Sequence, residues 1–403
     1  MNLFGWTRSA KGWCLPVIGT AGLLAVAVVA VRPWSWGAPG RPPAAARAEG
    51  PAASRPPRDS PVSLRPTLTF ADELDARAVD PLVERLRQDR PVSVSDALHV
   101  LRLFGPDAVC KPANGEGAPL PVLDTILDYE TGSAYFGGSG PPLIDTREGV
   151  RSRVVFRRDA RWQPERQAHD DQLLAILAEV GVPLSRRVRT PGGEHTVRNI
   201  LDDTLANFDL KKQEIEWSAL SVALYLPPRN SWFDKYGQRF TLDDVATELM
   251  ARLYRPRLSC AGTHLLYSMT ALMRADEQYA VLTPGVREEL REKLREAACA
   301  LPRSQSPDGM WGADWASPLR ETAGAGSPGA APRGDQILAT GHHVEWLMLL
   351  PPDMAPPREC LLAALRGLQV RLQADDPQLM RQNYCPYSHA ARVLRVLSRR
   401  EAP

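Results

Sequence analysis

The stretch Cys260-Ala-Gly-Thr-His-Leu-Leu-Tyr-Ser-Met-Thr-Ala-Leu-Met-Arg274 contains no Asp, Glu, Lys or Arg before its last residue. A segment of this length that is apolar on nearly every side predicts a helix buried in the protein interior. Its beginning is polar, since Cys260 and His264 stand four residues apart and therefore project from one helical face. Similar polar beginnings occur at Gly341-His-His-Val-Glu345 and Cys385-Pro-Tyr-Ser-His389. Together they predict that Cys, His and Glu side chains gather where buried helices begin.

Helices of two kinds alternate along the chain after residue 165. One kind is apolar nearly all round, whereas the other has a single apolar stripe and leaves its opposite face in water. The first kind is predicted at Gln172–Val180, Glu216–Leu226, Gly262–Arg274, Val344–Leu350 and Ala390–Leu397. The second kind is predicted at Val197–Phe208, Leu242–Leu253, the charged run around Leu290, and Arg358–Leu372. The spacing of the buried helices is regular except for one long interval, so we expect stacked helical hairpins.

This alternation predicts an all-α fold, an α/α toroid in which an inner ring of helices is wrapped by an outer ring. A straight helical solenoid gives a similar alternation and is the second choice. We expect the domain to span residues 68–403, with irregular insertions at about 106–165 and 303–339, where Gly and Pro interrupt the pattern.

The N-terminal region differs in composition from the rest of the chain. Leu15–Val31 is uncharged and follows Arg8 and Lys11, which predicts a transmembrane helix or signal anchor at residues 15–31 with residues 1–14 in the cytoplasm. A cleaved signal peptide is the alternative. Residues 32–67 are rich in Pro and Ala and predict a disordered linker. We therefore expect a single-pass membrane protein whose C-terminal domain is extracytoplasmic, and periplasmic if the cell is Gram-negative.

Charge and cysteine content exclude several classes of protein. The chain has 49 Lys and Arg against 47 Asp and Glu, so no net field favours nucleic acid as a partner. Its six cysteines match neither a disulfide framework nor a C-x-x-C zinc pattern. We expect Cys299 and Cys360 to be buried as small apolar side chains of amphipathic helices.

The segment Gln305-Ser-Pro-Asp-Gly-Met-Trp311 fits the Q-x-x-x-G-x-W element of triterpene cyclases. In its fold the chain therefore resembles the terpenoid cyclase and protein prenyltransferase superfamily of α/α toroids. The resemblance implies structural roles for Gln305, Gly309 and Trp311, which would brace the ends of helices.

The catalytic motifs of this superfamily are not reproduced. The acidic element with which triterpene cyclases protonate their substrate is incomplete at Asp202-Asp203-Thr204, and we expect both carboxylates to be solvated. The zinc ligands of protein prenyltransferases cannot be aligned with this chain. Separately, Gly341-His-His-Val-Glu-Trp346 is similar to a helix start in sugar epimerases of the N-acylglucosamine 2-epimerase family.

A candidate site follows from the predicted toroid. Parallel inner helices would bring their N-terminal ends together on one face of the central cavity, where buried polar groups need partners, water or a ligand. The candidate catalytic residues are the proton donors and acceptors there, namely His264, His342, His343, Glu345 and His389. The other residues expected to line the cavity are His169, Asp170, Glu216, Cys260, Thr263, Tyr384 and Cys385.

Three interpretations of these residues stay open, in decreasing order of preference: a structural cluster, a functional pocket, and a metal site. We predict no bound metal; zinc is the alternative, with Cys260, His264, His343, Cys385 and His389 as candidate ligands. For function, we expect a non-enzymatic protein that binds a partner or an envelope component through the cavity face. The alternative is an enzyme, a transferase, isomerase, hydrolase or lyase, that acts there on a lipid-like or carbohydrate substrate.

Overall fold

The computed structural model describes residues 56–136, 143–152, 169, 171–253, 259–316 and 333–399. All of them belong to one unit, Gly50–Pro403. The predicted transmembrane helix and most of the predicted linker lie outside the described residues. Within the part of the chain that is described, no helix is both long enough and apolar enough to cross a membrane.

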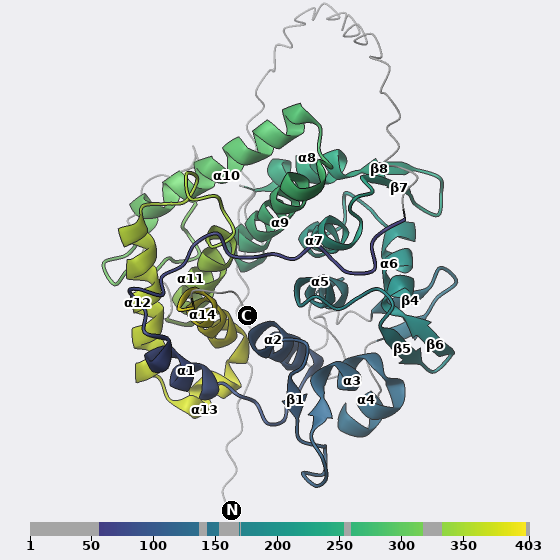
Figure 1. The fold of residues 1–403 in the computed structure, drawn as a ribbon, viewed down its shortest axis with the longest axis horizontal. Coiled ribbons are helices and arrows are strands. Elements are labelled where there is room, and N and C mark those ends of the chain that lie inside the picture. The colour runs from purple at the N-terminus through teal and green to yellow at the C-terminus, as the bar shows by residue number, and fades with distance from the viewer. Residues whose placement is uncertain are drawn as a thin grey trace, which may run out of the picture. The chain divides into compact units, whose positions relative to one another are not determined.

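The described chain is predominantly helical, with a few short hairpin strands (Figure 1). The helices are α1 (Ala76–Glu84), α2 (Val94–Phe104), α3 (Val122–Leu127), α4 (Tyr129–Phe136), α5 (Gln172–Glu179), α6 (Val197–Ala206), α7 (Ile215–Tyr225), α8 (Leu242–Arg252), α9 (Thr263–Tyr279), α10 (Pro284–Ser304), α11 (Arg333–Leu347), α12 (Arg358–Ala374), α13 (Pro377–Gln382) and α14 (Tyr384–Leu397). The strands form four antiparallel hairpins: β1 (Val109–Cys110) with β2 (Leu120–Pro121), β3 (Leu143–Asp145) with β4 (Val150–Ser152), β5 (Arg187–Thr190) with β6 (Gly193–Thr196), and β7 (Ser231–Phe233) with β8 (Arg239–Thr241).

The most buried helices pack against one another in succession. Helix α2 contacts α5, α5 contacts α7, α7 contacts α9, α9 contacts α11, α11 contacts α14, and α14 contacts α2. Every residue of α7 is buried. The helices predicted to be apolar nearly all round are thus the ones that pack between two other buried helices, as the predicted distinction from striped helices requires.

The striped helices cover this buried set. Helix α8 packs on α7 and α9, α10 on α8 and α9, and α12 on α11 and α14. Two of these covering helices begin at residues that favour a helix start: Thr241 caps α8 and forms a capping box with Asp244, and α10 begins at Pro284 after Thr283.

Three successive buried helices are entered through a left-handed residue. Asp171 before α5, Glu214 before α7 and Gly262 before α9 have φ of 56°, 56° and 81°. A non-glycine residue rarely adopts this conformation, because its Cβ approaches the following carbonyl oxygen. Its recurrence before three buried helices indicates a repeated structural unit.

Helix α11 differs from its prediction. We expected a buried helix to begin near Gly341, but α11 begins at Arg333 and Gly341 lies in its interior. A Cβ at this glycine would lie 3.0 Å from the backbone N of Ala390 and 3.0 Å from the Cβ of His389. The glycine therefore permits the close approach of α14, and the sequence pattern alone does not distinguish that role from a helix boundary.

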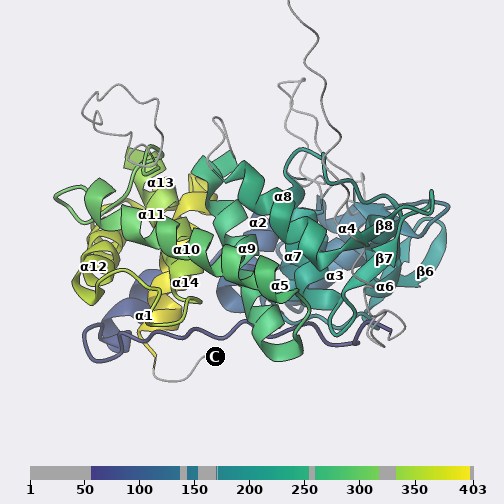
Figure 2. The same ribbon diagram turned by 90° about the horizontal axis from the view of Figure 1, so that it is seen from above.

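Residues 59–70 run along the C-terminal ends of buried helices (Figure 2). The N–H groups of Val62, Thr67 and Phe70 donate to the carbonyls of Leu224, Met348 and Leu397, each at 2.8 Å. These carbonyls stand at the ends of α7, α11 and α14, where a helix provides no partner of its own.

The packed unit therefore begins before residue 68, where the domain was predicted to start. Val62 and Phe70 are buried, and Leu64 and Leu68 pack against the same core. The high proline content predicted a disordered segment, but these four apolar side chains pack against the helical core, and such burial favours an ordered segment.

Candidate functional site

Glu345 of α11 is the centre of a buried polar cluster. Its Oε2 accepts a hydrogen bond from Nδ1 of His342 at 3.2 Å and lies 3.0 Å from Nδ1 of His389. Its Oε1 lies 2.9 Å from Nη1 of Arg392 and 3.3 Å from Nη2 of Arg102. Since the Glu345 side chain is only 2% exposed, these four groups replace water around the carboxylate.

A second buried carboxylate, Glu179 at the end of α5, shares both guanidinium groups. Arg102 donates to it in two bonds of 2.9 Å, Arg392 lies 2.7 Å away, and the Tyr267 hydroxyl donates at 2.7 Å. Two carboxylates and two guanidiniums balance in charge, which is the condition under which buried ions are tolerated.

Arg102, Glu179, Tyr267 and Arg392 are not among the residues that the sequence predicted for the site. A signal was present only for Glu179, which is the single charged residue of the otherwise apolar helix α5 and therefore needs a buried counter-ion. What the sequence did not contain was the pairing of α2, α5 and α14 that brings these charges together.

The arginines also determine the charge of both carboxylates. Burial alone would raise the pKa of Glu345, but Arg102, His389 and Arg392 hold it well below its ordinary value. Burial would likewise raise the pKa of Glu179, but Arg102 and Arg392 outweigh it and lower that pKa below its ordinary value. Both groups are therefore ionised at neutral pH.

Imidazole and indole rings form a continuous row beside this network. Ring centroids lie 5.2 Å apart for His99 and His389, 3.8 Å for His389 and His342, 4.7 Å for His342 and His264, and 4.6 Å for His264 and Trp217. The rings come from α2, α14, α11, α9 and α7, so five buried helices contribute to one site. The fold thus brings together three of the candidate histidines, with His99 and Trp217 added to them.

His169 continues the row at its other end. Its ring stacks on Trp217 at 5.5 Å and lies 5.9 Å from the ring of His264. Its Nδ1 lies 2.9 Å from the carboxylate of Glu214, at the start of α7.

The histidines differ in protonation. Burial lowers the pKa of His99 to about 4 and places the pKa values of His264 and His389 well below the ordinary value. Burial also disfavours the charged form of His342, but Cys260 and Glu345 outweigh it and raise the pKa of His342 to about 9. One charged imidazole therefore stands among neutral ones.

His343 does not join the row. Its ring lies 4.8 Å from that of Trp315 and 5.5 Å from that of Trp311, and its Nδ1 accepts a hydrogen bond from Nε1 of Trp346 at 3.1 Å. Adjacent residues of an α-helix point about 100° apart, so His342 and His343 cannot face one site. Among the two, only His342 lies with the predicted cluster.

The other predicted cavity residues are spread around the cluster. Glu216 is buried at the start of α7, and burial raises its pKa. Thr263 donates its hydroxyl to the carbonyl of Cys260, at the entrance of α9. Tyr384 is buried beside Cys385 at the start of α14, while Asp170 lies outside the described residues.

Three sets of side chains place potential metal ligands within 4.8 Å of one another. They are Cys260 with His264 and His342; His342 with Glu345 and His389; and His99 with Cys385 and His389. Four of the five candidate zinc ligands belong to these sets, which contain His342 in place of His343.

The residues of the Q-x-x-x-G-x-W element bind to helix ends. Nε2 of Gln305 donates to the carbonyls of Gly309 and Cys360 at 2.7 and 2.8 Å, which ties the loop to the start of α12. Nε1 of Trp311 donates to the carbonyl of Leu301 in the last turns of α10 at 3.0 Å. A side chain at Gly309 would lie 2.5 Å from the carbonyl oxygen of Ala363, so only glycine fits.

Two expectations about other side chains are wrong. Asp203 is 4% exposed rather than solvated, because the β3–β4 hairpin packs on α6 and brings it Thr146 and Arg151 as hydrogen-bond donors. Cys360 is buried as expected, but Cys299 is exposed. It lies next to, and not on, the apolar stripe of α10 formed by Leu290, Leu294, Ala297 and Leu301.

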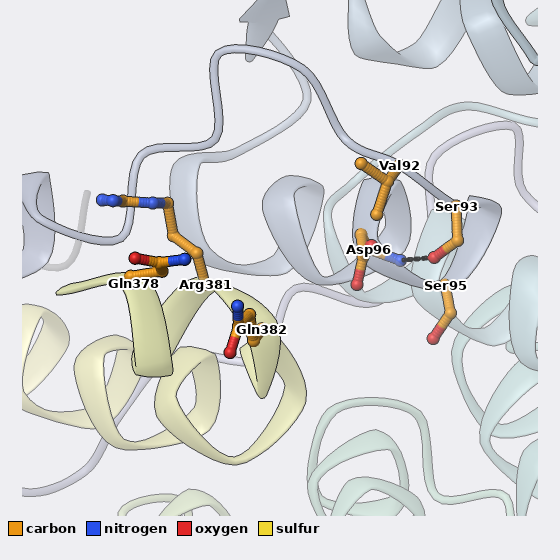
Figure 3. A pocket seen from close by; sticks show the side chains of 7 residues that line it. All are labelled: Val92, Ser93, Ser95, Asp96, Gln378, Arg381 and Gln382. Carbon is orange, nitrogen blue, oxygen red and sulfur yellow. Dashed lines mark hydrogen bonds between the residues drawn. The ribbon is translucent and has the colours of Figure 1, made fainter. Parts of the chain in front are cut away.

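A pocket of about 530 Å³ lies beside the cluster, between the start of α2 and helix α13 (Figure 3). Six of the seven residues that line it have polar side chains, although much of the exposed lining surface is apolar; they are Val92, Ser93, Ser95, Asp96, Gln378, Arg381 and Gln382. The carbonyl of Ser95 accepts a hydrogen bond from Nδ1 of His99 at 2.7 Å, so the pocket wall is continuous with the row of rings.

Comparison of the chain with protein-family models, with curated proteins and with solved structures found no match. The chemistry that this site supports therefore depends on its own geometry.

Proposed function

We propose that this chain is an α/α toroid that binds a carbohydrate-containing component of the cell envelope at the face where its inner helices begin. The succession of contacts from α2 through α5, α7, α9, α11 and α14 back to α2 supports an inner ring. The covering helices α8, α10 and α12 support an outer ring. The uncharged stretch Leu15–Val31 supports a membrane anchor that holds the domain outside the cytoplasm.

The observation that carries the proposal is the pocket between α2 and α13. Gln378, Arg381 and Gln382 stand on one side of it, and two serines and Asp96 stand on the other (Figure 3). Amide, hydroxyl, carboxylate and guanidinium groups hydrogen-bond to sugar hydroxyls and amides, and the apolar atoms between them can pack on the C–H groups of a sugar ring. This combination supports a carbohydrate among the expected ligands.

Co-sedimentation with purified peptidoglycan sacculi tests the proposal. We expect the full chain to bind, and the double variant Gln378→Ala/Arg381→Ala to lose at least tenfold in affinity. Arg366→Ala is the matched control, because Arg366 is exposed on α12 away from the pocket. Absence of binding by the folded parent, or equal binding by the pocket variant, would refute the proposal.

Catalysis is a second candidate function, and one observation favours it. His342, with a pKa raised to about 9, lies 4.7 Å from the ring of His264, whose pKa is well below its ordinary value. Neighbouring groups whose pKa values are pushed apart can serve as acid and base in one reaction. A bell-shaped pH dependence of sacculus degradation that His264→Gln abolishes would support an enzyme.

A further inference from the structure

We propose that Cys260, His264 and His342 form a zinc site at the entrance of α9. This inference deepens the proposed function, on which it rests for its role, because it places a metal at the same face of the protein as the proposed binding site. One thiolate and two imidazoles are ligands that suit zinc, and three protein ligands leave the fourth position for water or a ligand.

The geometry needs only a small adjustment. The Sγ atom of Cys260 and one ring nitrogen from each histidine lie within 4.8 Å of one another. Ligand atoms around a tetrahedral zinc ion lie roughly 3.5 Å apart, given bond lengths of about 2.0–2.3 Å. The side chains therefore have to close by about 1 Å around the ion, which rotation about their χ angles can supply.

Two buried nitrogens point to a ligand that completes the cluster. Nε2 of His342 and Nδ1 of His264 are both buried and have no hydrogen-bond partner among the described residues. Buried polar atoms of native proteins are rarely left in this state. A cation shared with the Cys260 thiolate would satisfy both nitrogens at once.

Glu345 orients one of these ligands. It accepts a hydrogen bond from Nδ1 of His342 at 3.2 Å, which keeps a proton on Nδ1. A cation would displace the second proton of the charged imidazole to solvent and bind Nε2. A carboxylate behind a metal-bound histidine is a common arrangement and strengthens the ligand. Arg102 and Arg392 fix the position of Glu345 in turn.

Cys260 is the least buried of the three ligands. It is only partly buried, whereas His264 and His342 are 8% and 3% exposed.

The two other ligand sets are less suited to a cation. In the set of His342, Glu345 and His389, the carboxylate is already bound by two guanidiniums. In the set of His99, Cys385 and His389, Nη1 of Arg102 lies 3.1 Å from Nδ1 of His389. Burial also raises the pKa of the Cys385 thiol, and a thiol must lose its proton to bind a metal.

The test is a titration of the full chain, stripped of metal with a chelator, with Zn²⁺ and with Co²⁺ as the spectroscopic probe. We expect one Zn²⁺ per chain, and a thiolate-to-cobalt absorption band. Cys260→Ala should abolish that band, and His264→Ala and His342→Ala should weaken Zn²⁺ binding at least 100-fold. Glu345→Gln should weaken it by about 10- to 100-fold, as expected for a carboxylate behind a ligand.

Cys385→Ala, Cys299→Ala and His195→Ala are the controls and should bind Zn²⁺ within threefold of the parent. The cobalt absorption band is measured on the parent protein, which carries no substitution. The test therefore remains decisive even if the histidine variants do not fold. The proposal is overturned if the folded parent binds no Zn²⁺, or if Cys385→Ala loses binding while Cys260→Ala keeps it.

Zinc binding and sacculus binding can fail independently. The pocket variant Gln378→Ala/Arg381→Ala should keep its Zn²⁺ stoichiometry, because neither side chain belongs to the cluster. A parent that binds Zn²⁺ but not sacculi would refute the proposed function and keep the metal site. A parent that binds sacculi but no Zn²⁺ would do the reverse.

Discussion

Arg102 of α2 and Glu179 of α5 form a bidentate ion pair, with Nε and Nη2 each 2.9 Å from one carboxylate oxygen. Their side chains are 6% and 1% exposed, and 77 residues separate them in the chain. The pair joins the first buried helix to the next one in the packing, so the charges of the site and the assembly of the helices depend on each other.

Glu179→Ala should therefore destabilise the protein strongly. It would leave Arg102 and Arg392 with only Glu345 as a buried counter-ion, and breaking a buried ion pair typically costs about 3–5 kcal/mol. Urea unfolding at pH 7 measures the loss. The control is Glu292→Ala, which removes an exposed partner of Arg295 and should cost less than about 0.5 kcal/mol. Equal costs for the two variants would contradict the role given to Glu179.

Phe70→Ala tests the segment that crosses the ends of the buried helices. Phe70 is 1% exposed, and removal of a buried phenylalanine side chain costs about 3–5 kcal/mol. Tyr236→Ala is the control, since Tyr236 is 82% exposed on the β7–β8 hairpin and its loss should change stability by at most about 0.5 kcal/mol. If residues 59–70 are a loose linker, thermal unfolding of the two variants will not differ.

Gly309→Ala and Gly237→Ala separate two effects of a glycine. Their φ angles are alike, +82° and +80°, but a Cβ at Gly309 would meet the Ala363 carbonyl oxygen at 2.5 Å whereas Gly237 has open space. Gly237→Ala should cost only the left-handed backbone penalty of about 1 kcal/mol. Gly309→Ala should cost at least about 1 kcal/mol more, because the loop has to move away from α12. Similar melting temperatures for the two variants would show that the close approach is unimportant.

The neutral buried histidines predict acid instability. Burial lowers the pKa of His99 from 6.5 to about 4 and that of His343 to about 3. Below pH 6.5 the unfolded chain binds protons that the folded chain does not, so the free energy of unfolding falls as the pH falls towards 4. Each histidine contributes on the order of 3 kcal/mol. Urea unfolding between pH 7 and 4 should show a shallower decline for His99→Gln than for His195→Gln, the partly exposed control.

His342 predicts the opposite dependence at higher pH. Its pKa is raised to about 9, so the folded chain keeps a proton that the unfolded chain releases above pH 6.5. The stabilisation is fully present below pH 6.5 and is lost as the pH rises through 9. In metal-free protein, His342→Gln should make the decline in unfolding free energy between pH 6.5 and 9.5 shallower. If the unfolding free energy of His342→Gln declines as steeply as that of the parent, a group other than His342 causes the decline.

The sequence predicted local features well where one element determines them. The apolar segment Gly262–Arg274 lies in α9 from its second residue onward, and the Thr241 cap and the start of α10 at Pro284 depend on neighbouring residues alone. The sequence did not predict the role of Gly341 inside α11, the packing of residues 59–67 on the helices, or the burial of Asp203. In each of these cases the contacts come from a distant part of the chain.

The sequence by itself determined that buried helices alternate with half-exposed ones and that Cys, His and Glu stand near several of their beginnings, because helical periodicity is a property of adjacent residues. Only the tertiary structure decided that His342 and not His343 faces the cluster, and that Arg102, Glu179 and Arg392 surround Glu345. The physical reason is that burial of a charge depends on which distant groups replace its water, and the packing of the helices selects those groups.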